Sequence, residues 1–242
     1  MRNYAYPGRF YDRADKSASA AQTIVPIIQS CIVGRSVLDV GCARGAWLAA
    51  WAAAGCSDLL GLDGAGVSSD SLLIDPANFR YCDVSTRFYL DRQFDIVQCL
   101  EVAEHLPSER GVSLVADLAA HGDVVLFSAA PPGQGGEFHV NERPYEYWRM
   151  LFASHGYVPF DCIRPLLASL KALPYWYRYN LVLYARDKGI ERLSTAARET
   201  RVSSDVRVSD VAPVIFQIRK FALRRLPYSL VNRLARLRGA LT

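Results

Sequence analysis

The sequence predicts an α/β fold in which a mostly parallel sheet carries helices on both faces. Short apolar runs alternate with helix-like segments along residues 36–185, an order typical of strands joined by crossover helices. Acidic residues also stand at or near the ends of four of these runs: Asp39, Asp63, Asp83 and Glu101. The carboxyl ends of parallel strands are where such sheets bind ligands, so we expect a ligand site at this edge.

The first strand and helix enclose a glycine turn. The stretch 36–45 begins with a short apolar run up to Asp39, which predicts a buried strand, and the alanine-rich residues 46–54 predict a helix. Gly41 and Gly45 bracket the turn, and glycine lets the backbone approach a ligand closely. The helix N-terminus offers unpaired N–H groups, but a carboxylate at Asp39 would repel phosphate. We therefore expect a cationic ligand without phosphates, and the missing Gly-x-Gly-x-x-Gly pattern disfavours a nicotinamide oxidoreductase.

The other elements continue the alternation. An aromatic and polar arm at residues 1–14 precedes a helix predicted at residues 16–32. Further helices are predicted from the N-cap Ser108 to about Ala120 and over residues 145–155. The remaining strands are predicted at residues 59–63, 79–84, 94–100, 123–128, 157–163 and 180–185.

The glycine turn carries a family resemblance. Asp39-x-Gly41-x-x-x-Gly45 resembles the first motif of class I S-adenosylmethionine-dependent methyltransferases, and the resemblance covers roughly residues 35–185. It implies a Rossmann-like, seven-stranded, mostly parallel sheet. The last two strands would form an antiparallel pair, because no helix of crossover length separates them. The resemblance also implies that S-adenosylmethionine is the cofactor and that Asp39, Gly41 and Gly45 bind it.

Three later acids extend this donor site. Asp63 ends the second strand 24 residues after Asp39, where a carboxylate can accept both ribose hydroxyls, as it does in the family. By resemblance, Asp83 contacts the adenine amino group and Glu101 lines the donor pocket. A turn before Gly64 is the structural alternative for Asp63, and a helix N-cap is the alternative for Asp83.

Two histidines lie at the same edge. The fourth strand runs into Glu101-x-x-Glu104-His105, and His139 follows the fifth strand. The pattern resembles a metal site of the small-RNA 3′-terminal 2′-O-methyltransferases and of the O-methyltransferases of ubiquinone biosynthesis. By that resemblance, Glu101, Glu104, His105 and His139 are candidate ligands of Mg²⁺ or Mn²⁺. A hydroxyl acceptor must lose its proton, so catalysis by His139 or His105 without a metal is an alternative, and a purely structural role is another.

The acceptor is indicated by a second resemblance. Residues 135–148 resemble bacterial methyltransferases associated with surface-polysaccharide and other glycan assembly. This favours a hydroxyl on a sugar or glycan intermediate. The aromatic cluster at residues 174–179 fits either internal packing or a sugar platform. No RNA-binding module is evident, so we do not expect a nucleic-acid partner.

The composition fits one domain with an appendage. The chain has 242 residues, is 51% hydrophobic, and has no uninterrupted apolar run long enough to span a bilayer. Its six cysteines form no C-x-x-C pair, so we expect buried thiols in a reducing cytoplasm rather than a zinc site. The net charge of +4 comes from the tail: residues 211–242 hold seven bases and no acid, which leaves −3 for residues 1–210.

The tail has two parts. Residues 190–212 are polar and rich in Ser and Arg, which predicts a loosely ordered linker. Residues 213–242 predict two helices separated by Pro227. The second has a leucine stripe with two arginines beside it: Leu230, Leu234, Leu237, Leu241, Arg233 and Arg236. A basic amphipathic tail fits a membrane surface, docking on the body or a homodimer contact.

These observations divide the chain into an N-terminal arm and helix (1–34), a methyltransferase domain (35–189), the linker and the basic helical tail. We expect a cytoplasmic enzyme, held by its tail at the inner face of the membrane, that methylates a hydroxyl on a sugar or glycan intermediate. A small-molecule O-methyltransferase of the natural-product or quinone type is an alternative. A catalytically inactive, membrane-peripheral scaffold is another, although the intact donor motif disfavours it.

Overall fold

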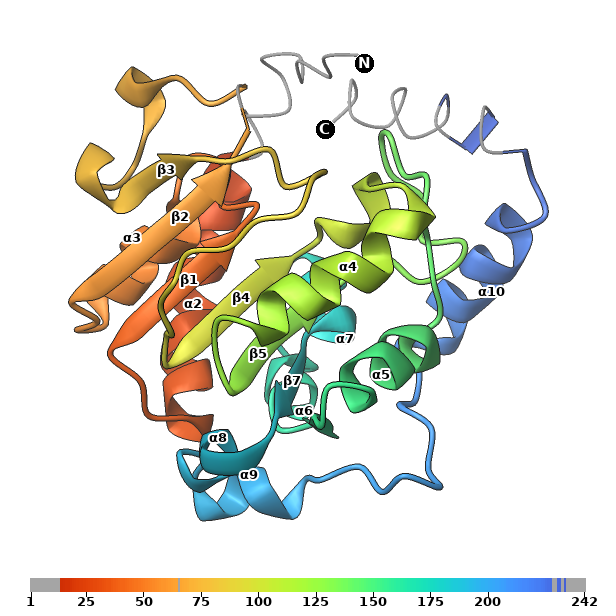
Figure 1. Ribbon diagram of the computed structural model, residues 1–242. Helices are drawn as coiled ribbons and strands as arrows, with labels where there is room; N and C mark the ends of the chain where they lie inside the picture. Colours follow the sequence, from red (N-terminus) through yellow and green to blue (C-terminus); the bar gives the residue numbers. More distant parts are fainter. Residues whose placement is uncertain (1–13, 65, 228–229, 232, 234–242) are drawn as a thin grey trace.

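The centre of the protein is one seven-stranded sheet (Figure 1). The computed structural model describes residues 14–64, 66–227, 230, 231 and 233. The strands are β1 (Ser36–Val40), β2 (Asp58–Asp63), β3 (Phe79–Tyr81), β4 (Ile96–Leu100), β5 (Val124–Ser128), β6 (Val158–Phe160) and β7 (Val182–Ala185). They lie in the order β3-β2-β1-β4-β5-β7-β6. The first five run parallel, and β7 is antiparallel to both β5 and β6, which confirms the predicted fold class.

Helices cover both faces of the sheet (Figure 1). On one face α2 (Ala14–Cys31) packs against α3 (Ala46–Ala53), and on the other α4 (Ser108–Ala119) packs against α5 (Tyr145–Ala153). Shorter helices follow β6 and β7: α6 (Arg164–Leu167), α7 (Tyr175–Asn180), α8 (Asp187–Glu191), α9 (Thr195–Glu199) and finally α10 (Val214–Leu223). Single turns of 3-10 helix occur at η1 (Ser69–Ser71), η2 (Pro76–Asn78) and η3 (Ala103–His105).

Each face of the sheet has its own apolar core. Trp51 of α3 packs with α2 on one side, and Trp148 and Phe152 of α5 pack with α4 on the other. Phe152 is fully buried and stacks on Tyr184 of β7, with ring centroids 4.2 Å apart. Burial of each such side chain stabilises the fold by roughly 1.5–3 kcal/mol. The two cores fix the strands whose ends carry the acids.

Several predicted elements end earlier than expected. The third strand stops at Tyr81 instead of residue 84, because it lies at the sheet edge and its pairing with β2 ends at Asp63. The sixth strand stops at Phe160, where the chain turns towards α6. Ser108 was the expected N-cap of α4, but Pro107 occupies that position and no side chain caps the helix.

Residues 190–212 are packed on the body, contrary to the expected loose order. Leu193 pairs with Ile32, and Arg201 pairs with Phe160 in a second isolated bridge. This segment also buries four apolar side chains: Leu193, Ala197, Val208 and Ala212. The apolar residues of this segment are spaced widely among polar ones, so its composition does not reveal the packing. The limits of the predicted domains stay predictions.

The tail helix α10 docks on the body through one face. Phe216 contacts the rings of Tyr175 and Tyr179, at centroid distances of 5.3 and 5.8 Å. Arg219 Nη1 donates to the Gln134 carbonyl at 3.1 Å. Of the predicted leucine stripe, Leu230 is exposed, and the other three leucines and the N-terminal arm lie outside the described residues. Among the described residues, no helix combines the length and the apolar character needed to span a membrane.

Candidate active site

The predicted acids lie at one edge of the sheet. Asp39 is near the end of β1, Asp63 is the last residue of β2, and Glu101 follows β4 directly. Because β1 lies between β2 and β4, the structure places these three strand ends side by side. The amide of Cys82 donates to the Asp63 carbonyl at 2.8 Å, which brings the segment after β3 to the same edge. The edge therefore has the position at which parallel sheets bind ligands.

The glycine turn after β1 has a left-handed backbone at three positions. Gly41, Ala43 and Gly45 have φ angles of 81°, 47° and 83°. A Cβ atom on Gly41 would lie 2.4 Å from Val102 Cγ2, so a larger residue would displace the segment that follows β4. Asp63 stabilises the turn, because its carboxylate accepts the amides of Ala43 and Gly64, both at 2.6 Å. The predicted Asp63 turn is thus present, and Asp63 lies beside the glycine motif.

Asp39 is a buried carboxylate. Its side chain is 3% exposed, and its Oδ2 atom has no hydrogen-bond partner among the described residues. Burial raises the pKa of Asp39 to about 7. Burial also raises the pKa of Asp63, although the amides of Ala43 and Gly64 oppose that shift. An unpaired buried oxygen is costly, so a cationic group of a ligand fits this position.

Glu101 has a left-handed backbone, with a φ of 55°. Its carboxylate accepts hydrogen bonds from Gln134 Nε2 at 2.9 Å and from Asn180 Nδ2 at 3.1 Å. Asn180 also donates to Gln134 Oε1 at 2.8 Å and accepts from the Tyr145 hydroxyl at 2.9 Å. A non-glycine residue in this conformation costs roughly 1–3 kcal/mol and is found mostly at functional sites. Sequence reasoning missed Gln134, Asn180 and Tyr145.

Three of the four candidate metal ligands cluster. One ligand atom each from Glu104, His105 and His139 lies within 4.8 Å of the others. Glu101 is not part of this group. Glu104 is fully buried; its Oε1 accepts the Ala130 amide at 3.2 Å, and its Oε2 has no partner among the described residues. A carboxylate with two imidazoles is a donor set that fits a divalent transition ion, including Mn²⁺, better than Mg²⁺.

The protonation of this cluster is set by burial. Burial and the neighbouring Glu101 carboxylate raise the pKa of Glu104 well above its ordinary value. Burial, together with the neighbouring His139, lowers the pKa of His105 to about 3. The rings of His105 and His139 meet edge to face, with centroids 4.9 Å apart. Burial therefore favours the neutral form of both side chains, and at neutral pH His105 is a neutral imidazole.

His139 is oriented by Glu142, a residue that sequence reasoning did not identify. His139 Nδ1 lies 2.9 Å from Glu142 Oε1, and the carboxylate also accepts the amides of Gly133 and Gly135 at 2.7 and 2.8 Å. Because the carboxylate only accepts, Nδ1 donates the proton and Nε2 keeps its lone pair. A Cβ atom on Gly136 would lie 2.1 Å from His139 Nε2, so only glycine leaves room for this ring.

Asp83 lies further out than the other acids. Its side chain is exposed, and Oδ1 accepts the amide and hydroxyl of Ser85 at 3.0 and 2.6 Å. It forms a turn rather than the N-cap of a helix. The expected contact of Asp83 with adenine stays a prediction.

The comparisons with known proteins agree with this geometry. A family model described as a methyltransferase domain matches residues 11–167. A ubiquinone biosynthesis O-methyltransferase of Methylococcus capsulatus is 33% identical over 105 residues, which are 40% of this chain and 44% of the relative. A sugar N-methyltransferase from a Streptoalloteichus species has a similar structure with a TM-score of 0.55 at 18% identity, covering 77% of this chain and 96% of the other. The chain spans less than half the length of the curated relative that it matches.

The family model covers more than half of the chain, and the seven-stranded, mostly parallel sheet with its glycine turn is the one that the resemblance implies. The chain therefore belongs to the methyltransferase-domain family.

Proposed function

We propose that this enzyme methylates a hydroxyl group and that His139 is the general base that takes the hydroxyl proton. S-adenosylmethionine supplies an electrophilic methyl group when it is bound. The site has to hold the acceptor oxygen in line with that methyl group, and such positioning supplies a large part of the rate in displacement reactions. A hydroxyl is a weak nucleophile, so a base within reach adds about 10²–10⁴-fold.

The His139–Glu142 pair carries this proposal. Glu142 accepts a hydrogen bond from Nδ1–H, which selects the tautomer whose Nε2 can accept a proton and stabilises the imidazolium once it forms. The backbone amides of Gly133 and Gly135 hold the Glu142 carboxylate in place. The ring of His105 lies edge-on to the ring of His139, and we include His105 in the proposed catalytic site as the neighbour of the base.

The donor side of the proposal rests on four acids and two glycines. Asp39 binds the cationic end of the donor, Asp63 binds the ribose and Asp83 binds the adenine. Glu101 lines the donor pocket. Gly41 and Gly45 keep the turn open. Support comes from the unpaired Oδ2 of Asp39 and from the convergence of the strand ends.

For the acceptor we propose a sugar or glycan intermediate, on the likeness of residues 135–148 to glycan-associated methyltransferases. A small molecule of the quinone type is the second candidate, favoured by the partial match to an O-methyltransferase of ubiquinone biosynthesis. A scaffold without turnover is the third. Polysaccharide biosynthesis as the setting follows only from the first candidate.

A metal is the alternative to a free base. Glu104, His105 and His139 would hold it, and it would acidify the acceptor hydroxyl. The unpaired Oε2 of Glu104 supports this alternative, whereas the burial that raises the pKa of Glu104 opposes it, because a metal binds the ionised carboxylate. Full activity after treatment with EDTA would exclude it, and activity restored only by Mn²⁺ or Mg²⁺ would replace the free-base mechanism.

We also propose that α10 contacts a membrane surface, which would bring the enzyme to lipid-linked acceptors. Four apolar side chains of α10 are exposed: Val214, Ile215, Ile218 and Phe221. Arg224 and Arg225 flank Phe221 and would attract anionic lipids. Co-sedimentation with anionic vesicles that survives Ile215→Ser with Ile218→Ser would argue against it. If these substitutions instead convert a dimer into a monomer, the face is a homodimer contact.

These proposals are tested in order, beginning with the donor site. Calorimetric titration of the protein with S-adenosylmethionine tests the donor site, and Asp63→Ala should abolish binding. Transfer of a labelled methyl group is then measured with sugar nucleotides, lipid-linked glycans and catechols. His139→Gln should abolish transfer while donor binding remains. Transfer that persists in this variant would remove His139 as the base.

A further inference from the structure

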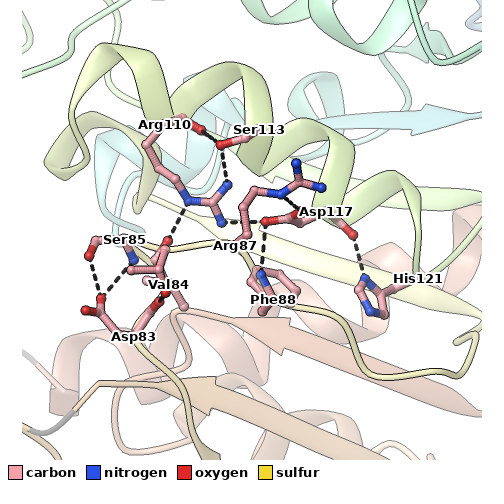
Figure 2. Close-up of polar contacts among 10 residues, drawn as sticks. Asp83, Val84, Ser85, Arg87, Phe88, Arg110, Ser113, Asp117 and His121 are labelled. Carbon is pink, nitrogen blue, oxygen red and sulfur yellow. Dashed lines mark hydrogen bonds and ion pairs between the residues drawn. The ribbon is translucent and has the colours of Figure 1, made fainter.

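A polar stripe runs along α4 where an apolar face is expected. Arg110, Ser113 and Asp117 follow one another at helical spacing, and His121 lies just beyond the helix end (Figure 2). Arg110, Asp117 and His121 are only 6%, 1% and 0% exposed. Charged side chains are almost never buried to this extent unless they are paired, so this stripe has a specific partner.

That partner is the backbone of the segment that follows β3. Arg110 Nε donates to the Val84 carbonyl at 3.0 Å. Further along, the Phe88 amide donates to Asp117 Oδ2 at 3.4 Å, and the Leu90 amide donates to His121 Nε2 at 3.0 Å (Figure 2 shows the first two contacts). Arg110, Asp117 and His121 thus form hydrogen bonds with the backbone at three successive positions of residues 84–90.

The centre of the stripe is a buried ion pair. Arg110 Nη2 lies 2.7 Å from Asp117 Oδ2, and Nη1 donates to Ser113 Oγ at 2.8 Å. A buried ion pair seldom stabilises a fold more than apolar residues of similar volume would. Its particular effect here is geometric, because Asp117 and Ser113 contact the same guanidinium that donates to the Val84 carbonyl.

The held segment begins at the donor edge. Asp83 precedes Val84, and the backbone amide of the neighbouring Cys82 donates a hydrogen bond to the Asp63 carbonyl. A nucleoside whose ribose lies at Asp63 would extend its base towards Asp83 and Val84. We infer that Arg110 and Asp117 are positioning residues, which fix the Asp83–Val84 pair for recognition of the donor's adenine. This inference rests on the proposed donor site.

The test is base discrimination rather than affinity alone. Arg110→Lys keeps the charge, but one ammonium cannot bond Val84, Ser113 and Asp117 in the same fixed geometry. Dissociation constants are measured for S-adenosylhomocysteine and for its inosine analogue, in which the adenine amino group is replaced by oxygen. We expect the wild-type protein to prefer adenine by about tenfold, the effect of one hydrogen bond. In Arg110→Lys the ratio should fall to about one.

The matched control is Arg87→Ala. Arg87 contacts the same Asp117 carboxylate, but its side chain is 68% exposed. It should retain the wild-type ratio. Ser113→Ala, which removes one bond to Arg110 and no charge, should fold and give an intermediate ratio, so the test does not depend on the folding of Arg110→Lys.

An unchanged ratio in Ser113→Ala, and in Arg110→Lys where that variant folds, would overturn the inference while leaving the donor site intact. An equal loss in Arg87→Ala would also overturn it, because the effect would then belong to the ion pairs of Asp117 in general. If the wild-type protein binds no S-adenosylhomocysteine, the proposed donor site fails and this inference fails with it.

Discussion

Replacing Asp39 with asparagine should stabilise the ligand-free protein at alkaline pH. The ordinary pKa of 3.8 is raised to about 7 by burial. Between about pH 4 and pH 7 the folded protein therefore holds a proton that the unfolded chain has lost, so the stability contributed at Asp39 falls as the pH rises through this window. Three pKa units correspond to about 4 kcal/mol above pH 7, and to less than half of that at pH 5.

Asp39→Asn removes this penalty with almost no change of shape. We expect the melting temperature to rise at pH 8 by about 2–4 °C for each kcal/mol recovered, and to rise much less at pH 5. Thermal unfolding at both pH values measures the difference. Asp58→Asn is the matched control: Asp58 begins β2 at the other end of the sheet, and its exposed ion pair with Arg92 should contribute less than about 1 kcal/mol.

The same substitution should weaken donor binding at least about tenfold, because the amide cannot pair with a cationic group as a carboxylate does. Binding to the wild-type protein at pH 6.5 should release a proton from Asp39, which titrations in buffers of different ionisation enthalpy detect. Asp39→Asn should show no such release. An equal change of stability at pH 5 and pH 8, or an unchanged donor affinity, would refute the reasoning.

Three further outcomes follow from the contacts. Glu142→Gln should lower kcat by about 10²-fold with donor affinity unchanged, since it removes the partner of the His139 imidazolium; an unchanged kcat would contradict this. Gly136→Ala should displace the His139 ring and lower kcat in the same way, which the transfer assay and a donor titration together would show. Phe152→Ala should destabilise the fold by about 3–5 kcal/mol in denaturant unfolding, whereas the exposed Met150→Ala in the same helix should change it by less than about 0.5 kcal/mol.

The fold class and the donor edge could be predicted because short stretches of sequence determine both. The strand at Asp39 and the glycine turn after it are defined by ten residues, and Asp63 follows from the spacing to the next strand. Burial on both sheet faces confirms these elements.

The contacts of Glu101 could not be predicted in this way. Gln134 and Asn180 are 33 and 79 residues away from it, and they meet only because β7, which follows Asn180, inserts between β5 and β6. No local pattern marks either residue. Glu142 is different, since it lies three residues after His139 and its acidic character was a usable signal.

The same network affects how the tail can be tested. Gln134 donates to the Glu101 carboxylate with its side chain, while its carbonyl accepts from Arg219 of α10. The tail helix is therefore hydrogen-bonded to Gln134, a residue that contacts the predicted donor pocket through Glu101. Deleting residues 213–242 would change that pocket together with any membrane contact, and a loss of activity would have two causes. Substitutions confined to Ile215 and Ile218 leave the Arg219 contact in place, so they separate membrane binding from the integrity of the site.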